Sequence, residues 1–255
     1  ERILDATAAA GRRRLNEADA LRVLEAYDIP VTPWRFVSQE GGESLATAAG
    51  AAARRLGFPV AFKIVSPEVI HKTDVGGVML DLDSEEAVGR AVRAMVRRVS
   101  QAAGAGEAVG ADAAGTGQKK AKAKIDGILV QRMAARGRET IVGLTRVPRV
   151  GPLVMFGLGG VYVEVLRDVV LRLSPLRDTD AAEMLREVKM RRLLEGVRGE
   201  PPRDLEALTA TLLRVSQLAQ RHPRISELDI NPLLAMEKGA VAVDARVQLA
   251  DEPPP

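Results

Sequence analysis

ISELDINPLLAMEKGAVAVDARVQL, residues 225–249, is the most informative segment of this sequence. Apolar and polar residues alternate on both sides of the turn signal EKG at 237–239, and this pattern predicts a β-hairpin. A two-residue turn at 237–238 places Asn231 directly opposite Asp244, whereas a turn at 238–239 leaves them diagonal neighbours. Because strand side chains alternate in direction, both registers put the two side chains on one face.

Two more acidic residues, Glu227 and Asp229, fall on the same face of the predicted hairpin. Polar side chains inside apolar strands are costly unless they find a partner. Oxygen ligands gathered in this way suit Mg²⁺, which commonly takes one or two protein carboxylates and completes its shell with phosphate and water. The hairpin face is therefore suited to a magnesium ion.

The composition is that of a soluble globular protein. The chain has 255 residues, enough for one large domain or two small ones, with 46% apolar and 28% charged residues. No apolar run approaches the roughly 20 residues that a membrane-spanning helix needs, and no secretory signal opens the chain. The net charge of +3 is spread over many arginines and aromatic residues make up only 3%, so nucleic-acid binding is not expected.

Cysteine is absent from the chain, which excludes disulfides, zinc–thiolate sites and a thiol nucleophile. These absences favour the cytoplasm. The chain begins at Glu1 rather than Met, as expected of a segment of a longer protein.

Helices and strands are mixed along the chain without a strict βαβ repeat, which predicts an α+β fold with two lobes. Asn16 and Ser84 read as helix N-caps and Gly57 as a helix stop. A low-complexity segment at 101–124 is expected to be a surface insertion. Helices are predicted at 16–27, 43–56, 178–188 and 204–221 and from Ser84 onward. Strands or apolar runs are predicted at 33–37, 59–65, 78–82, 125–133, 139–147, 152–166 and 171–176. The strands at 125–133 and 139–147 are expected to form a hairpin around Arg136-Gly137.

One segment of the first half carries residues suited to phosphate. Lys63 interrupts the apolar strand at 59–65; a structural lysine would extend to the sheet edge, whereas this strand leads into a glycine-containing loop that can aim an ammonium at phosphate oxygens. In that loop, Gly76-Gly77 permits positive φ or close backbone approach to phosphate. His71 is either a solvent-exposed loop histidine or a phosphate ligand and transient phosphoryl acceptor.

The second half adds a glycine cluster and two acidic residues. FGLGG at 156–160 lacks the P-loop pattern and a full dinucleotide fingerprint, so a plain glycine turn and a phosphate-side loop are equal interpretations. Glu139 and Glu164 lie in or beside apolar strands, where each either faces water or holds ribose or metal. His222, between a predicted helix and Pro223, is interpreted as structural.

Taken together, these motifs resemble the ATP-grasp half (the β subunit or β region) of ADP-forming acyl-CoA synthetases, and more distantly the β subunit of succinyl-CoA synthetase. The resemblance covers about residues 14–250. It rests on LNEADALRVLEAYDIPV, PVAFKIVSPEVIHKTDVGGV, GILVQRM, GPLVMFGLGGVYVEVL with LRLSPL, and ELDINPL followed by AVDARV. Two features depart from the family pattern: Val147 stands where relatives usually place an acidic residue before the proline, and the insertion is longer than usual.

The resemblance implies an ATP-grasp fold of α/β two-layer sandwiches, with two lobes and a nucleotide cleft between them. The lobes are expected at 1–124, including the insertion, and at 125–255, including the metal-site hairpin. Lys63 would contact the ATP phosphates, Gly76 and Gly77 would line the phosphate loop, and His71 would relay the phosphoryl group. The other implied site residues are Gln131, Arg132 and Met133 at the adenine hinge, Glu139, Gly159, Gly160 and Glu164 beside the nucleotide, and Asn231 and Asp244, supported by Asp229, as ligands of Mg²⁺.

The same resemblance implies half of an enzyme. A CoA-binding domain and a domain with a swinging phosphohistidine are expected on a partner subunit or a fused region. In the implied reversible reaction, acid, CoA and ATP give acyl-CoA, ADP and phosphate, and this chain passes phosphate between Mg·ATP or Mg·ADP and the phosphohistidine. The alternative is a regulatory ATP-grasp-like region of a bacterial protein lysine acetyltransferase, joined to a fused acetyltransferase domain.

Overall fold

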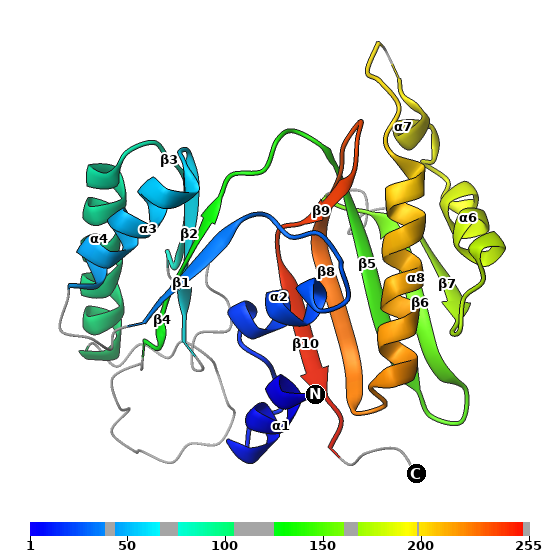
Figure 1. Cartoon of the computed structure of the whole chain (residues 1–255), viewed down its shortest axis with the longest axis horizontal. Coiled ribbons are helices and arrows are strands. Elements are labelled where there is room, and N and C mark those ends of the chain that lie inside the picture. The colour runs from blue at the N-terminus through cyan, green and yellow to red at the C-terminus, as the bar shows by residue number, and fades with distance from the viewer. Residues whose placement is uncertain (39–43, 67–75, 105–124, 161–167, 198, 252–255) are drawn as a thin grey trace. The chain divides into compact units, whose positions relative to one another are not determined.

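The computed structural model describes residues 1–38, 44–66, 76–104, 125–160, 168–197 and 199–251. His71, Glu164 and most of the predicted insertion lie outside these ranges. The chain forms two compact units: unit 1 comprises Glu1–Val31 and Ala134–Pro255, and unit 2 comprises Thr32–Met133 (Figure 1). Each unit combines an antiparallel sheet with helices, which confirms the predicted α+β class.

This division differs from the boundary expected between residues 124 and 125. Helices α1 (Arg2–Ala9) and α2 (Glu17–Glu25) belong to unit 1, where α2 packs against strand β10 (Ala245–Leu249). Strand β4 (Gly127–Arg132) belongs to unit 2, because it pairs there with a strand on each side. The unit boundaries therefore follow contacts between segments that are distant in sequence.

Unit 2 is a four-stranded antiparallel sheet with two helices packed on it. The strand order is β1 (Trp34–Ser38), β4, β2 (Val60–Val65) and β3 (Val78–Leu82). Helix α3 (Leu45–Leu56) ends at Gly57 with φ of 83°, and α4 (Glu85–Gly104) begins after Ser84, whose Oγ accepts the Ala87 N–H at 3.2 Å. Alternate residues of the central strands form one core with these helices, among them Phe62, Ile64, Ile128 and Val130.

Unit 1 is built on a six-stranded antiparallel sheet. The strand order is β10, β8 (Ile225–Ala235), β5 (Arg138–Val147), β6 (Gly151–Leu158) and β7 (Val169–Leu173), and β9 (Ala240–Ala242) pairs with β8. Helix α8 (Leu205–Arg221) packs against β5, β6, β8 and β9, and α6 (Asp178–Glu187) packs against α8 and β7 (Figure 1). The alternate strand residues beneath α8, such as Val154, Phe156 and Ile230, are completely buried. We call the opposite side of this sheet the far face.

Strands β4 and β5 do not form a hairpin, so the prediction of one around Arg136-Gly137 is wrong. β4 lies between β1 and β2 in unit 2, and β5 lies between β8 and β6 in unit 1. The hydrogen-bonding edges of both strands are therefore filled by other strands. The sequence also does not predict α1, whose N-cap Glu1 makes no side-chain cap hydrogen bond, or the four-residue helix α7 (Arg192–Glu195). Among the described residues, no helix combines the length and apolarity needed to cross a membrane.

The C-terminal end of α8 is held by an arginine of the sheet. Arg146 of β5 donates hydrogen bonds to the carbonyl oxygens of Ile225 at 2.7 Å, of His222 at 3.2 Å and of Ala219. Burial lowers the pKa of the Arg146 guanidinium below its ordinary value. A guanidinium in this place donates to carbonyl groups at the end of the helix and just beyond it, and it complements the helix dipole.

Replacing Arg146 with Met should destabilise unit 1, because its hydrogen bonds to the three carbonyl oxygens are lost while most of the aliphatic volume stays. We expect the free energy of unfolding, measured by urea denaturation, to fall by about 1–3 kcal/mol. Arg186→Met on the exposed side of α6 is the matched control and should change it by less than about 0.5 kcal/mol. Equal stability of the Arg146 variant and the wild-type chain would contradict this role.

Candidate functional site

The terminal hairpin has the register with its turn at residues 237–238. Leu233 pairs with Ala242, and the Met236 N–H donates to the Gly239 carbonyl at 3.1 Å. The Asn231 N–H donates to the Asp244 carbonyl at 3.2 Å, so these two residues stand opposite each other. Of the two predicted registers, the structure selects the one that brings Asn231 and Asp244 closest.

The pairing continues along β10 in the same register. Arg246 stands opposite Asp229, and Gln248 stands opposite Glu227. Residues between them, such as Leu228 and Val247, are buried. A register shift between β8 and β5 lies beside Asn231, between the pairs Thr140–Leu233 and Val142–Ile230. The shift has the form of a β-bulge, which lets both ends of β8 keep their apolar side chains beneath α8.

The fold affects the ionisation of Asp229. Burial raises the pKa of Asp229 above its ordinary value of 3.8, and the nearby positive charge of Arg246 offsets part of this rise. On β5 its neighbour is Gly143, which has no side chain to pair with it. A bound cation would therefore stabilise the ionised form of Asp229.

The donor set fits a magnesium ion that shares its coordination with phosphate. Asn231 and Asp244 offer an amide oxygen and a carboxylate from opposing positions. The described ranges contain no cluster of three or more His, Cys, Asp or Glu residues that could hold a metal by itself. Few protein ligands with oxygen donors are typical of Mg²⁺ sites completed by phosphate and water.

In unit 2, the structure brings Lys63 and the two glycines together. Lys63 is only 7% exposed and pairs with Val78 of β3. The next residue of β2, Ile64, donates its N–H to the Gly77 carbonyl at 2.8 Å. Gly76 has φ of +64°, as expected for a turn that only glycine adopts easily. Because Phe62 and Ile64 belong to the core with the helices, Lys63 lies on the opposite face of the sheet.

Gln131 and Arg132 lie at the end of β4, and Met133 follows directly. The Gln131 side-chain amide is buried and donates to the Thr32 hydroxyl. The Arg132 N–H donates to the Pro33 carbonyl at 2.8 Å, and the Met133 N–H donates to the Pro59 carbonyl at 3.0 Å. Since both N–H groups are used inside the unit, a base at this segment would be recognised through other groups.

Glu139 and the glycine pair form a second close arrangement in unit 1. The Gly159 N–H donates to the Glu139 carbonyl at 2.8 Å. A Cβ at Gly159 would lie 3.0 Å from the Glu139 Cβ, and one at Gly160 would lie 3.0 Å from Glu139 Oε2. Glycine therefore permits the close approach of this loop to Glu139. Glu164, predicted beside them, lies outside the described residues.

Three polar residues with specific partners in the structure were not predicted from the sequence. Thr32 is the acceptor for Gln131, and Arg246 is the cross-strand partner of Asp229. Asp168 is 3% exposed and accepts the N–H groups of Lys189 at 2.8 Å and Met190 at 2.9 Å. The available signal for Asp168 was an acidic residue at the start of an apolar strand; the other two depend on pairings that the sequence does not reveal.

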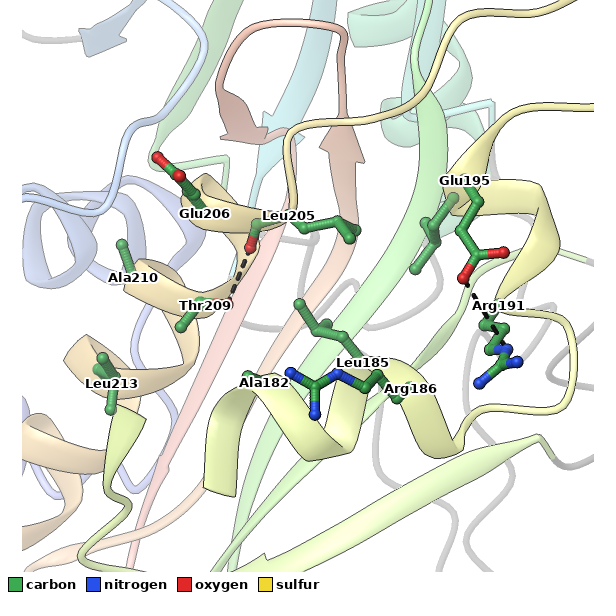
Figure 2. A pocket seen from close by; sticks show the side chains of 11 residues that line it. Ala182, Leu185, Arg186, Arg191, Glu195, Leu205, Glu206, Thr209, Ala210 and Leu213 are labelled. Atoms are coloured by element: carbon green, nitrogen blue, oxygen red, sulfur yellow. Dashed lines mark hydrogen bonds and ion pairs between the residues drawn. The ribbon is translucent and has the colours of Figure 1, made fainter. Parts of the chain in front are cut away.

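A pocket of about 360 Å³ lies elsewhere in unit 1, between α6, α7 and α8 (Figure 2). Its lining is mainly aliphatic, with Leu185, Leu205 and Leu213 among the residues drawn, and Arg191 and Glu195 form an ion pair of 3.9 Å at its edge. None of the predicted site residues lines this pocket. Its chemistry is not that of phosphate binding.

Replacing Asp229 with Asn should stabilise the chain at neutral pH when no metal or nucleotide is bound. Because the pKa of Asp229 is raised in the folded state, the folded chain holds this proton more strongly, and stability is lost as pH rises through the range above 3.8. The wild type and Asp229→Asn should therefore differ in unfolding free energy at pH 7 and converge near pH 3, in urea titrations with EDTA. A variant that is less stable at pH 7 would contradict the electrostatic account.

A family model and known proteins match nearly the whole chain. The family model described as ATP-grasp domain matches residues 6–249. The β subunit of ADP-forming acetate–CoA ligase I from Pyrococcus furiosus is 40% identical over 242 residues, which cover 95% of this chain and 94% of that subunit. ADP-forming acetate–CoA ligase I from Archaeoglobus fulgidus is 40% identical over 252 residues, 99% of this chain, but the chain spans only 33% of the length of that relative.

Two solved structures superpose on nearly the whole chain. Acetyl-coenzyme A synthetase 1 of Ca. Korarchaeum cryptofilum, in complex with coenzyme A, Ca-AMPCP and HgCl+, superposes with a TM-score of 0.85 at 41% identity, over 98% of this chain and 99% of that one. Another structure of that enzyme, with coenzyme A and Mg-AMPPCP and its phosphohistidine segment pointing towards the nucleotide binding site, gives a TM-score of 0.80 at 40% identity, over 98% and 99%. The chain therefore belongs to the ATP-grasp domain family, among the β subunits and β regions of the ADP-forming acyl-CoA synthetases.

Proposed function

We propose that this chain is the nucleotide-binding, phosphoryl-transferring component of an ADP-forming acyl-CoA synthetase. The reaction is acid + CoA + ATP = acyl-CoA + ADP + phosphate, and it is reversible. The observation that carries the proposal is the opposition of Asn231 and Asp244 in a chain that is 40% identical to a ligase β subunit over 94% of that subunit. An oxygen donor pair of this kind suits a metal that also binds nucleotide phosphates.

Unit 1 provides the proposed metal ligands, Asn231 and Asp244, with Asp229 in support. When bound, Mg²⁺ would neutralise charge that gathers on the phosphate oxygens during transfer. Glu139, Gly159, Gly160 and Glu164 are proposed to lie beside the nucleoside. Support comes from the contact of the glycine pair with Glu139, which leaves no room for larger side chains there.

Unit 2 provides the proposed phosphate contacts. Lys63 contacts the phosphates with its ammonium group, while Gly76 and Gly77 approach them with the backbone. His71 is proposed to relay the phosphoryl group, and Gln131, Arg132 and Met133 are proposed to flank the adenine. Burial of Lys63 supports its part, since a charge in a buried strand interacts more strongly with phosphate than one in water.

The partner is proposed to be a subunit or fused domain that binds CoA and carries the phosphohistidine. The Pyrococcus furiosus relative is a subunit, and the longer Archaeoglobus fulgidus relative has two thirds of its length outside the matched region. The Korarchaeum enzyme binds coenzyme A and has a phosphohistidine segment. ATP and CoA are intracellular metabolites, so the proposed compartment is the cytoplasm.

Asn231→Ala and Asp244→Ala should each abolish Mg-dependent turnover of the chain assembled with its partner, because each removes one of two opposing metal ligands. The melting temperature should stay near that of the wild type. Glu237→Ala, at the exposed turn of the same hairpin, is the matched control and should retain full turnover. Activity of either site variant equal to the wild type would refute the metal assignment.

Lys63→Met should lower kcat by about 10²- to 10³-fold, since one preorganised charge on the transferring phosphoryl group is lost. Met keeps the volume of the buried aliphatic stem, so the fold should be preserved. Lys63→Arg keeps the charge and should recover part of the rate. Steady-state ATP synthesis from acyl-CoA, ADP and phosphate measures both variants, and a kcat of Lys63→Met within threefold of wild type would rule out the proposed role.

A further inference from the structure

The far face of the sheet in unit 1 arranges its polar residues in successive rows. Glu139, at the start of β5, pairs with Leu234. Further along, Asn231 opposes Asp244. The next row on β8 and β10 is Asp229 with Arg246, beside Gly143 of β5. From Glu139 to Gly143 the strand advances four residues, about 13 Å at the usual rise.

These rows run in the order in which a nucleotide presents its parts. In the proposed function, Glu139 lies beside the nucleoside and the Asn231–Asp244 pair holds the metal on the phosphates. A phosphate chain is linear, so the row beyond the metal meets the phosphate farthest from the nucleoside. Arg246 is the cation of that row.

The side chain of Arg246 is suited to bind a phosphate there. Its paired position with Asp229 puts both side chains on the far face, because Ala245 and Val247 on either side of it are buried. Arg246 is exposed and, within the described part of the chain, makes no ion pair within 4.0 Å with Asp229 or another acidic residue. The charged groups of this face next to it are Asp229 and, one row further, Glu227. A guanidinium with free donors beside two carboxylates also counters their repulsion of an incoming phosphate.

We propose that Arg246 binds the terminal phosphoryl group of the nucleotide, the group that is transferred; this rests on the proposed function. During ATP synthesis the P–N bond to the phosphohistidine that delivers the group to ADP breaks, with the electron pair kept by the histidine nitrogen, and a P–O bond forms to the terminal oxygen of ADP. Arg246 donates through its guanidinium N–H groups to the non-bridging oxygens of the moving group. It therefore favours ATP and the transition state over ADP.

Calorimetry of the chain with Mg·ADP and with Mg·AMPPCP tests this assignment. Arg246→Ala should lower the affinity for the ATP analogue by about 10- to 100-fold, the loss expected for a charge-assisted hydrogen bond. The affinity for ADP should fall by less than about threefold. Arg246→Lys should restore part of the analogue affinity. Arg186→Ala, an exposed arginine on α6, should bind both nucleotides like the wild type.

Different results would contradict the role of Arg246 and the proposed function. Equal losses for ADP and the analogue, or no loss for either, would overturn the role of Arg246 while leaving the proposed function in place. Failure of the wild-type chain to bind both nucleotides would reject the proposed function, and this inference with it. If Arg246 served only to balance Asp229, the analogue-specific loss would disappear in the Asp229→Asn background; a loss that persists there supports contact with phosphate. Melting curves of all variants identify any that fail to fold, and in that case Arg246→Lys decides the question.

Discussion

The structure of the site depends on one backbone register, that of β8 against β9 and β10. Asn231 opposes Asp244, and Asp229 opposes Arg246, because Leu233 pairs with Ala242 and Leu228 with Val247. A slip of one residue would turn every side chain of the strand to the opposite face. Polar groups would then lie under α8 and leucines on the far face. The apolar core beneath α8 therefore fixes the arrangement of the polar residues on the other side.

In each unit, local packing determines where the proposed site residues lie. In unit 2, β2 and β4 bury one set of side chains under α3 and α4, and the alternation of the strand leaves Lys63 on the other side. In unit 1, Gly159 and Gly160, directly after β6, approach Glu139 at the start of β5 closely. In both units the proposed site residues lie in or next to paired strands, which suits a reaction that relies on positioning and charge.

Local features of the site could be predicted from the sequence, and non-local ones could not. The hairpin, the Asn16 cap and the unusual lysine at position 63 are signals contained within a few residues, and the structure bears out the hairpin and the cap. The choice between two registers needed the pairing of the whole strand. The membership of β4 in unit 2 depends on β1 and β2, which are distant in sequence. Arg246 was overlooked for the same reason, since an arginine between apolar strand residues has meaning only once Asp229 is known to face it.

Asn231 and Asp244 are proposed to hold the metal of a nucleotide jointly. An anomalous difference map of crystals of the chain grown with Mn·ADP, in which Mn²⁺ replaces Mg²⁺, locates that metal. We expect a single strong peak at about 2.1 Å from the Asn231 side-chain oxygen and from an Asp244 carboxylate oxygen, shared with ADP phosphate oxygens. A peak bound to ADP but remote from both residues would contradict this proposal.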